Sequence, residues 1–102
     1  MAKVYIEEVA TMGRDLAGYR MTVASEPPVA SQTVAIGASS VQSAPFNAST
    51  TVVRVHVDAV CSIEIGANPT ATASTRRMAA SSTEYFGVPA DQSFRLAVIQ
   101  NA

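Results

Sequence analysis

Apolar and polar residues alternate along most of the chain, and valine, isoleucine and threonine dominate the alternating runs. Successive side chains of a strand point to opposite faces, so this period of two predicts strands that bury one face. We expect seven strands, at residues 3–9, 19–24, 32–36, 51–57, 61–65, 83–88 and 93–100. Helical signals are scarce by comparison.

Residues that favour turns separate these runs, and they limit where a helix can form. Gly13 and Gly18 each disfavour a helix by about 1 kcal/mol relative to alanine, so only a short helical turn around residues 11–17 is possible. The stretches at 37–50 and 70–82 are rich in Ala, Ser and Thr and are interpreted as long loops or extended arms. No repeat or linker divides residues 1–102, which we expect to form a single domain. The pattern predicts an all-β fold, an antiparallel β-sandwich that is jelly-roll-like or immunoglobulin-like.

The longest alternating run is "TVVRVHVDAVCSIEIG", residues 51–66. A straight strand of that length would span roughly 50 Å, too long for so small a domain, so the run must bend or turn near residues 58–60. A hairpin with a three-residue connection would set Val57 opposite Cys61, and Arg54 opposite Glu64. The connection has no glycine, which such hairpins favour, so a bulged continuous strand is the alternative.

The single cysteine and the single histidine of the chain both lie in this run. Alternation places Cys61 on the apolar face and His56 on the polar face, and opposite faces of one sheet exclude a Cys–His catalytic pair. We therefore interpret Cys61 as a small core residue. His56, Asp58 and Glu64 would be too few ligands for a metal, and Arg54 on the same face would repel a cation.

Other catalytic patterns are missing from the sequence. It has no G-x-S-x-G elbow, no G-x-G-x-x-G motif and no P-loop. A carboxylate pair for glycoside hydrolysis stays open, although the chain has no tryptophan and few aromatic residues for a sugar platform. Glu7 and Glu8 are interpreted as the exposed side and end of the first strand. We expect no enzyme activity, no catalytic residue, no metal and no cofactor.

Composition changes this picture in one respect. Only 15% of the residues are charged while 48% are hydrophobic, which suggests that neighbouring molecules cover part of the surface. The net charge of −1 gives no electrostatic footprint for nucleic acid. No run of 18 apolar residues predicts a membrane span, and no signal-peptide pattern precedes the first strand, so we expect synthesis in a reducing cytoplasm.

Two later strands contribute to a candidate interface. The last strand carries Ala97 and Ile99 on the face opposite Leu96, so it lies either between two layers or against a partner. Tyr85 has the apolar area and polar tip that suit an interface, or it covers a sheet edge within the monomer. The candidate interface residues are Arg54, His56, Glu64, Tyr85 and Ile99.

Three stretches resemble small virion proteins of tailed bacteriophages: "TTVVRVHVDAVCSIEIGANPTATAST" (50–75), "RRMAASSTEYFGV" (76–88) and "SFRLAVIQ" (93–100). A valine-rich strand, a strand with a cysteine that ends in a Gly-Ala-Asn-Pro turn, and a Glu-Tyr-Phe strand lead to an aliphatic last strand. The resemblance implies a capsid decoration or cement protein with a jelly-roll-like sandwich. Asp91 in "VPADQ" stands where a glycine is expected in the turn.

The resemblance also implies partners. Such a protein would bind the major capsid protein of a phage shell and stabilise the shell by mass action. It would do so as a homodimer or homotrimer on a local symmetry axis, with no nucleic-acid or membrane partner. It would be made in the cytoplasm of the bacterial host and reside on the capsid surface of the virion. The alternative is a receptor- or carbohydrate-binding β-sandwich module of a phage tail or fibre.

Overall fold

The computed structural model describes residues 2–14, 16–24 and 26–101. Within these ranges the chain forms strands and no helix, as the alternating pattern predicts. The strands are β1 (Lys3–Val9), β2 (Met12–Arg14), β3 (Arg20–Ala24), β4 (Ala30–Ala35), β5 (Val41–Gln42), β6 (Val52–Val57), β7 (Cys61–Gly66), β8 (Arg76–Met78), β9 (Ser82–Gly87) and β10 (Arg95–Gln100).

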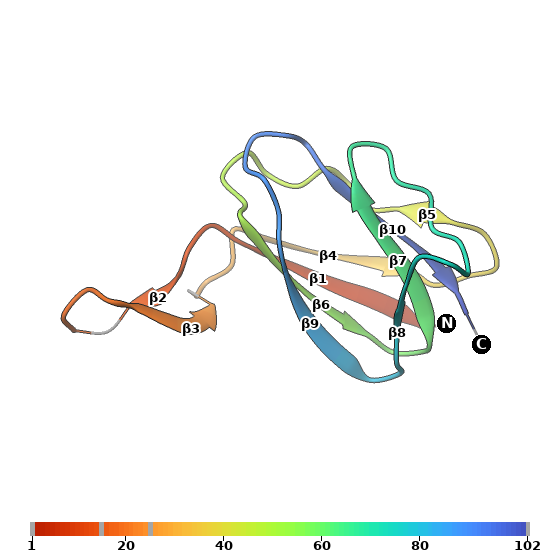
Figure 1. The fold of residues 1–102 in the computed structure, drawn as a ribbon, viewed down its shortest axis with the longest axis horizontal. Coiled ribbons are helices and arrows are strands. Elements are labelled where there is room, and N and C mark those ends of the chain that lie inside the picture. Colours follow the sequence, from red (N-terminus) through yellow and green to blue (C-terminus); the bar gives the residue numbers. More distant parts are fainter. Residues whose placement is uncertain (1, 15, 25, 102) are drawn as a thin grey trace.

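Eight of these strands form two four-stranded antiparallel sheets (Figure 1). The first sheet has the order β4-β1-β6-β9, and the second sheet has the order β5-β10-β7-β8. The apolar faces of the two sheets form one buried core, so the molecule is a β-sandwich. The core consists of Val4, Ile6, Val34, Ile36, Phe46, Val53, Val55, Val57, Cys61, Ile63, Met78, Val88, Leu96 and Val98. Burying each large aliphatic side chain stabilises the fold by about 1.5–3 kcal/mol relative to leaving it exposed.

The strands pair as in a jelly roll, but the chain begins at a different strand: β1 occupies the position that the last strand of a jelly roll normally has. If β1 is counted after β10, the strands pair as nested antiparallel partners: β7 with β8, β6 with β9, β5 with β10, and β4 with β1. Further pairs, β1 with β6 and β10 with β7, join these partners into the two sheets. A long hairpin rolled up in this way produces the two Greek keys of a jelly roll.

Side chains make contacts across both open sides of the sandwich. On one side Gln32 of β4 bonds both backbone groups of Ala44, donating to the carbonyl at 3.2 Å and accepting from the N–H at 2.9 Å. On the other side the Arg76 guanidinium of β8 lies 5.1 Å from the ring centroid of Phe86 in β9. The Arg76–Phe86 contact joins the two sheets, and the Gln32 bonds join β4 to the connection that follows β5.

Both arrangements considered for residues 58–60, a hairpin and a bulged continuous strand, are wrong. The run does turn there, but β6 stays in the first sheet while β7 enters the second, so the two strands do not pair. Val57 and Cys61 meet in the core from opposite layers rather than as cross-strand neighbours. Period-two alternation is the same whether a chain folds back on its own sheet or crosses to the facing one, and crossing buries the same residues.

The seven predicted strands all occur, with ends that differ by at most two residues. The helical turn considered at residues 11–17 is wrong where the structure describes it, because Met12–Arg14 forms β2. The loops predicted at 37–50 and 70–82 contain two short strands, β5 and β8. Asp91 has a φ of 60°, the left-handed conformation that glycine favours and aspartate tolerates, so aspartate can stand where a glycine was expected.

The hairpin of β2 and β3, here called the arm, projects from the sandwich (Figure 1). It connects β1 to β4, and its strands pack on each other and hardly on the two sheets. The turn between them has Gly18 at a φ of 88°, and the Arg14 side chain donates to the Gly18 carbonyl at 3.0 Å. Leu16, Tyr19 and Val23 are exposed on this arm.

Part of the outer face of the second sheet is covered by the chain itself. Gln42 on this face donates to the carbonyl of Pro69 at 2.8 Å, and Asn101 donates to the Ser62 hydroxyl at 2.7 Å and to the Ala73 carbonyl at 3.4 Å. The loop of residues 67–75 therefore lies over the sheet. This cover explains why Ala97 is completely buried on the side away from the core.

Candidate functional site

The outer face of the first sheet has no such cover, and its side chains form ordered cross-strand rows. The sheet registers place Tyr5 between Thr33 and His56, and Thr83 beyond His56. A second row runs from Ser31 through Glu7 and Arg54 to Tyr85. These are the polar positions that alternate with the buried valines and isoleucines, so the alternation that builds the core also builds this face.

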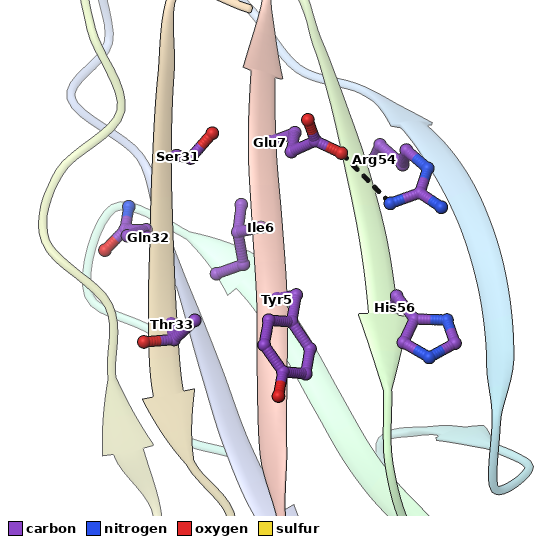
Figure 2. Close-up of a pocket in the computed structure, with 8 residues that line it drawn as sticks. All are labelled: Tyr5, Ile6, Glu7, Ser31, Gln32, Thr33, Arg54 and His56. Carbon is purple, nitrogen blue, oxygen red and sulfur yellow. Dashed lines mark hydrogen bonds and ion pairs between the residues drawn. The ribbon is translucent and has the colours of Figure 1, made fainter.

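The first row holds two aromatic rings in a defined arrangement. The ring centroids of Tyr5 and His56 lie 6.2 Å apart with their planes tilted by 44°. The Nδ1 atom of His56 lies 2.8 Å from the hydroxyl of Thr83 on the neighbouring strand β9. This hydrogen bond holds the imidazole on the side that faces β9. Figure 2 shows both rings projecting from neighbouring strands on the same face.

The second row carries a charged pair. Arg54 Nη1 donates to Glu7 Oε1 at 3.0 Å, and about a third of each side chain is exposed, 36% for Arg54 and 32% for Glu7 (Figure 2). Such a half-exposed pair contributes little to stability, about 1 kcal/mol or less. Its more important effect is that the two charges neutralise each other on this face.

Between β4, β1 and β6 these rows leave an open groove of about 540 Å³. Its lining includes Tyr5, Glu7, Ser31, Thr33, Arg54 and His56. The lining therefore combines aromatic rings, the hydroxyls of Tyr5, Ser31 and Thr33, and a compensated ion pair. Two of the three strands beneath it, β1 and β6, are paired on both sides. A groove on such a rigid platform is suited to binding rather than to movement.

The predicted interface residues fall on two opposite faces of the sandwich. Arg54, His56 and Tyr85 share the outer face of the first sheet, with Tyr85 exposed on the edge strand β9. Glu64 and Ile99 lie on the outer face of the second sheet, where Glu64 is exposed and Ile99 is partly buried. The position of Arg54 opposite Glu64 that a hairpin would give does not occur, because β6 and β7 belong to different sheets; the ion-pair partner of Arg54 is Glu7.

The reading of Glu8 as an exposed strand end is also wrong. Glu8 follows Val4 and Ile6 on the inward face of β1 and is only 2% exposed. Its Oε1 atom accepts hydrogen bonds from the Thr50 hydroxyl at 2.8 Å and from the Asn47 N–H at 2.7 Å. The carboxylate therefore anchors the connection between β5 and β6 onto the first sheet.

The residues first considered for chemistry are far from forming a reaction centre. Cys61 is completely buried, and this burial raises the pKa of its thiol because the thiolate would lose its hydration. His56 and Glu64 belong to different sheets. Among the described residues, no group of three or more His, Cys, Asp and Glu side chains is placed to hold a metal ion. The described part of the chain also has no helix that could cross a bilayer.

Sequence reasoning missed Tyr5, Thr33 and the arm. Tyr5 alternates with Val4 and Ile6, and this pattern indicates that it points outward. Its nearness to His56 depends on the register between β1 and β6, which the sequence of one strand does not reveal. Leu16 and Tyr19 lie in a stretch with weak strand signals. No family model, curated protein or solved structure matches this chain.

Proposed function

We propose that this chain is a structural virion protein that decorates a tailed-phage capsid and stabilises it as a small homo-oligomer. Its partners would be the major capsid protein and further copies of itself, and its place would be the capsid surface. The proposal includes no enzymatic step. It draws on the resemblance of residues 50–75, 76–88 and 93–100 to small phage virion proteins and on the projecting arm of the molecule.

The arm is the observation that carries the proposal. A two-stranded hairpin alone is marginally stable in water, and the arm has almost no packing against the sandwich. It also exposes Leu16, Tyr19 and Val23, apolar area that a neighbouring molecule would bury. A compact sandwich with a projecting arm of this kind is suited to reaching across a joint between subunits.

The low charge of the chain supports the same function. Charged residues make up 15% of the sequence, and interface cores are depleted in charge relative to other protein surfaces. A protein that binds across joints of a finished shell stabilises it in proportion to its affinity and concentration, with no need for chemistry. A ring or dimer of such arms on a symmetry axis would bind several capsid subunits at once.

A binding measurement tests the proposal. Purified chain is mixed with undecorated capsids of the phage that encodes it, and the pellet after sedimentation is quantified as the chain is titrated. We expect saturable binding at a fixed ratio to capsid subunits and a higher temperature of capsid disruption. Absence of binding at micromolar concentrations would overturn the proposal. Cryo-electron microscopy of whole particles would distinguish a capsid position from the tail or fibre position of the alternative.

A further inference from the structure

The groove on the first sheet has no role in the proposed capsid binding through the arm. We propose that this groove binds a neutral carbohydrate, with the Tyr5 and His56 rings as the platform. The proposal does not depend on where the protein resides, because it concerns the outer face of β4, β1 and β6 only (Figure 2).

The aromatic part of the groove provides the first argument. One face of a sugar ring is lined by C–H groups while its rim carries hydroxyls, so it binds best where apolar rings lie next to polar atoms. Tyr5 and His56 provide rings 6.2 Å apart, and each also has a polar atom at its edge. The Thr83 hydroxyl holds His56 at 2.8 Å, so the platform is ordered before any ligand arrives.

The charge of the groove selects among polar ligands. Arg54 Nη1 lies 3.0 Å from Glu7 Oε1, and the two side-chain charges cancel each other. The lining therefore offers no excess charge to a phosphate or to a cation. One of the five N–H donors of the Arg54 guanidinium bonds Glu7 Oε1, and the Glu7 carboxylate has a second oxygen that can also accept. Ser31 and Thr33 add hydroxyls that can both donate and accept. Hydroxyl-rich neutral ligands match this set.

The size and the backbone of the groove fit the same ligand. Its volume of about 540 Å³ lies within the roughly 300–1,000 Å³ of small-ligand sites. A peptide strand would add its backbone to the free edge of the sheet nearest the groove, which is the outer edge of β4, whereas the groove lies over the face formed by β4, β1 and β6. The occupant is therefore bound by side chains, as a short saccharide would be.

Nuclear magnetic resonance of the ¹⁵N-labelled full chain provides the test. Maltotriose, cellotriose and chitotriose are each titrated to millimolar concentration, with inorganic phosphate as the charged comparison. We expect saturable shifts from at least one sugar, centred on β1, β4 and β6, and none from phosphate. No saturable shift from any of the three sugars, saturable binding of phosphate, or sugar shifts centred on another surface would overturn the proposal.

Variants separate the groove from the rest of the face. Tyr5→Ala is expected to weaken sugar binding by about tenfold or more. Tyr85→Ala is the matched control, because Tyr85 is an exposed aromatic on the same sheet that does not line the groove, and it should bind as the parent does. Thr33→Arg, at an exposed site on the edge strand, should block the groove without touching the core. Unchanged affinity in both Tyr5→Ala and Thr33→Arg would overturn the assignment.

Discussion

Glu8 and Thr50 are joined by a buried hydrogen bond across 42 residues of sequence. The hydroxyl lies 2.8 Å from the carboxylate, and the two residues are 2% and 1% exposed, so water cannot take the place of either partner. The same oxygen of Glu8 accepts the backbone N–H of Asn47. One side chain of β1 thus determines how the chain enters β6, the central strand that leads to the second sheet.

Removing this acceptor should destabilise the whole fold. Glu8→Ala would leave the buried Thr50 hydroxyl without this acceptor and would remove the acceptor of the Asn47 N–H, at a cost of about 1–3 kcal/mol in the free energy of unfolding. Glu7→Ala is the matched control, since it removes a neighbouring carboxylate from a half-exposed pair and should cost about 1 kcal/mol or less. Urea unfolding followed by circular dichroism measures both. Equal effects of the two variants would contradict the anchoring role of Glu8.

Cys61 should be chemically inert and should make stability fall at alkaline pH. Burial raises the pKa of its thiol, so the unfolded chain loses the proton first as the pH rises. The stabilising contribution is complete below the ordinary thiol pKa of 9.0 and is lost as the pH rises from there toward the folded value. Cys61→Ala has no thiol to titrate. The difference in unfolding free energy between the more stable parent and this variant should therefore become smaller above about pH 9, where the parent loses the contribution of the thiol.

A thiol reagent gives an independent measurement of the same site. The folded protein should react with an aromatic disulfide only as fast as it opens, and the unfolded protein should react at once. Rapid labelling of the folded chain at neutral pH would contradict the core position of Cys61 and reopen the question of its reactivity.

The strands could be read from the sequence because valine-rich alternation is a strong local signal. That signal located β6 and β7 and placed Arg54 and His56 together on the exposed face. It did not reveal β5, which has two residues, or β8, where two exposed arginines precede the buried Met78. Alternation describes which face is buried and carries no information about which sheet a strand joins.

The split of the candidate interface has the same origin. Glu64 is polar and outward, like Arg54, and only the crossing at residues 58–60 separates the two faces. The two-sided character of the last strand was recognised correctly, but the layer over Ala97 is the loop of residues 67–75 rather than a partner. That cover depends on long-range hydrogen bonds of Gln42 and Asn101, which no local pattern indicates.

The arm should be dispensable for folding and necessary for capsid binding. Val29 donates to the Glu8 carbonyl at 2.7 Å, so β1 and β4 are still paired where the arm begins. Replacing residues 10–28 with an Asn-Gly turn would join Val9 to Val29 as a two-residue hairpin. We expect cooperative unfolding with a midpoint close to that of the parent, together with loss of sedimentation with capsids. Full binding by the variant would show that another surface makes the contact.

The jelly-roll pairing predicts that the chain can be opened at the arm and closed at its present ends. Residues near both ends are tied to the same two segments: Ile36 donates to the Ala2 carbonyl and Gln100 to the Gly37 carbonyl, each at 2.9 Å. Asp58 donates to the Lys3 carbonyl at 3.1 Å, and Asn101 to the Val60 carbonyl at 3.3 Å. A short Gly-Ser linker should therefore join the ends without strain.

A circular permutant with new ends at residues 16–18 of the arm would begin with β3 and β4 and end with β1 and β2, which is the ordinary jelly-roll order. Because every sandwich pairing is kept, we expect the parent's amide spectrum in the two sheets and cooperative urea unfolding. A permutant opened between Asp58 and Ala59 is the control, since it cuts the crossing between the sheets and releases the ties of both ends. The control should be clearly less stable, and the reverse order of stability would contradict the nested pairing.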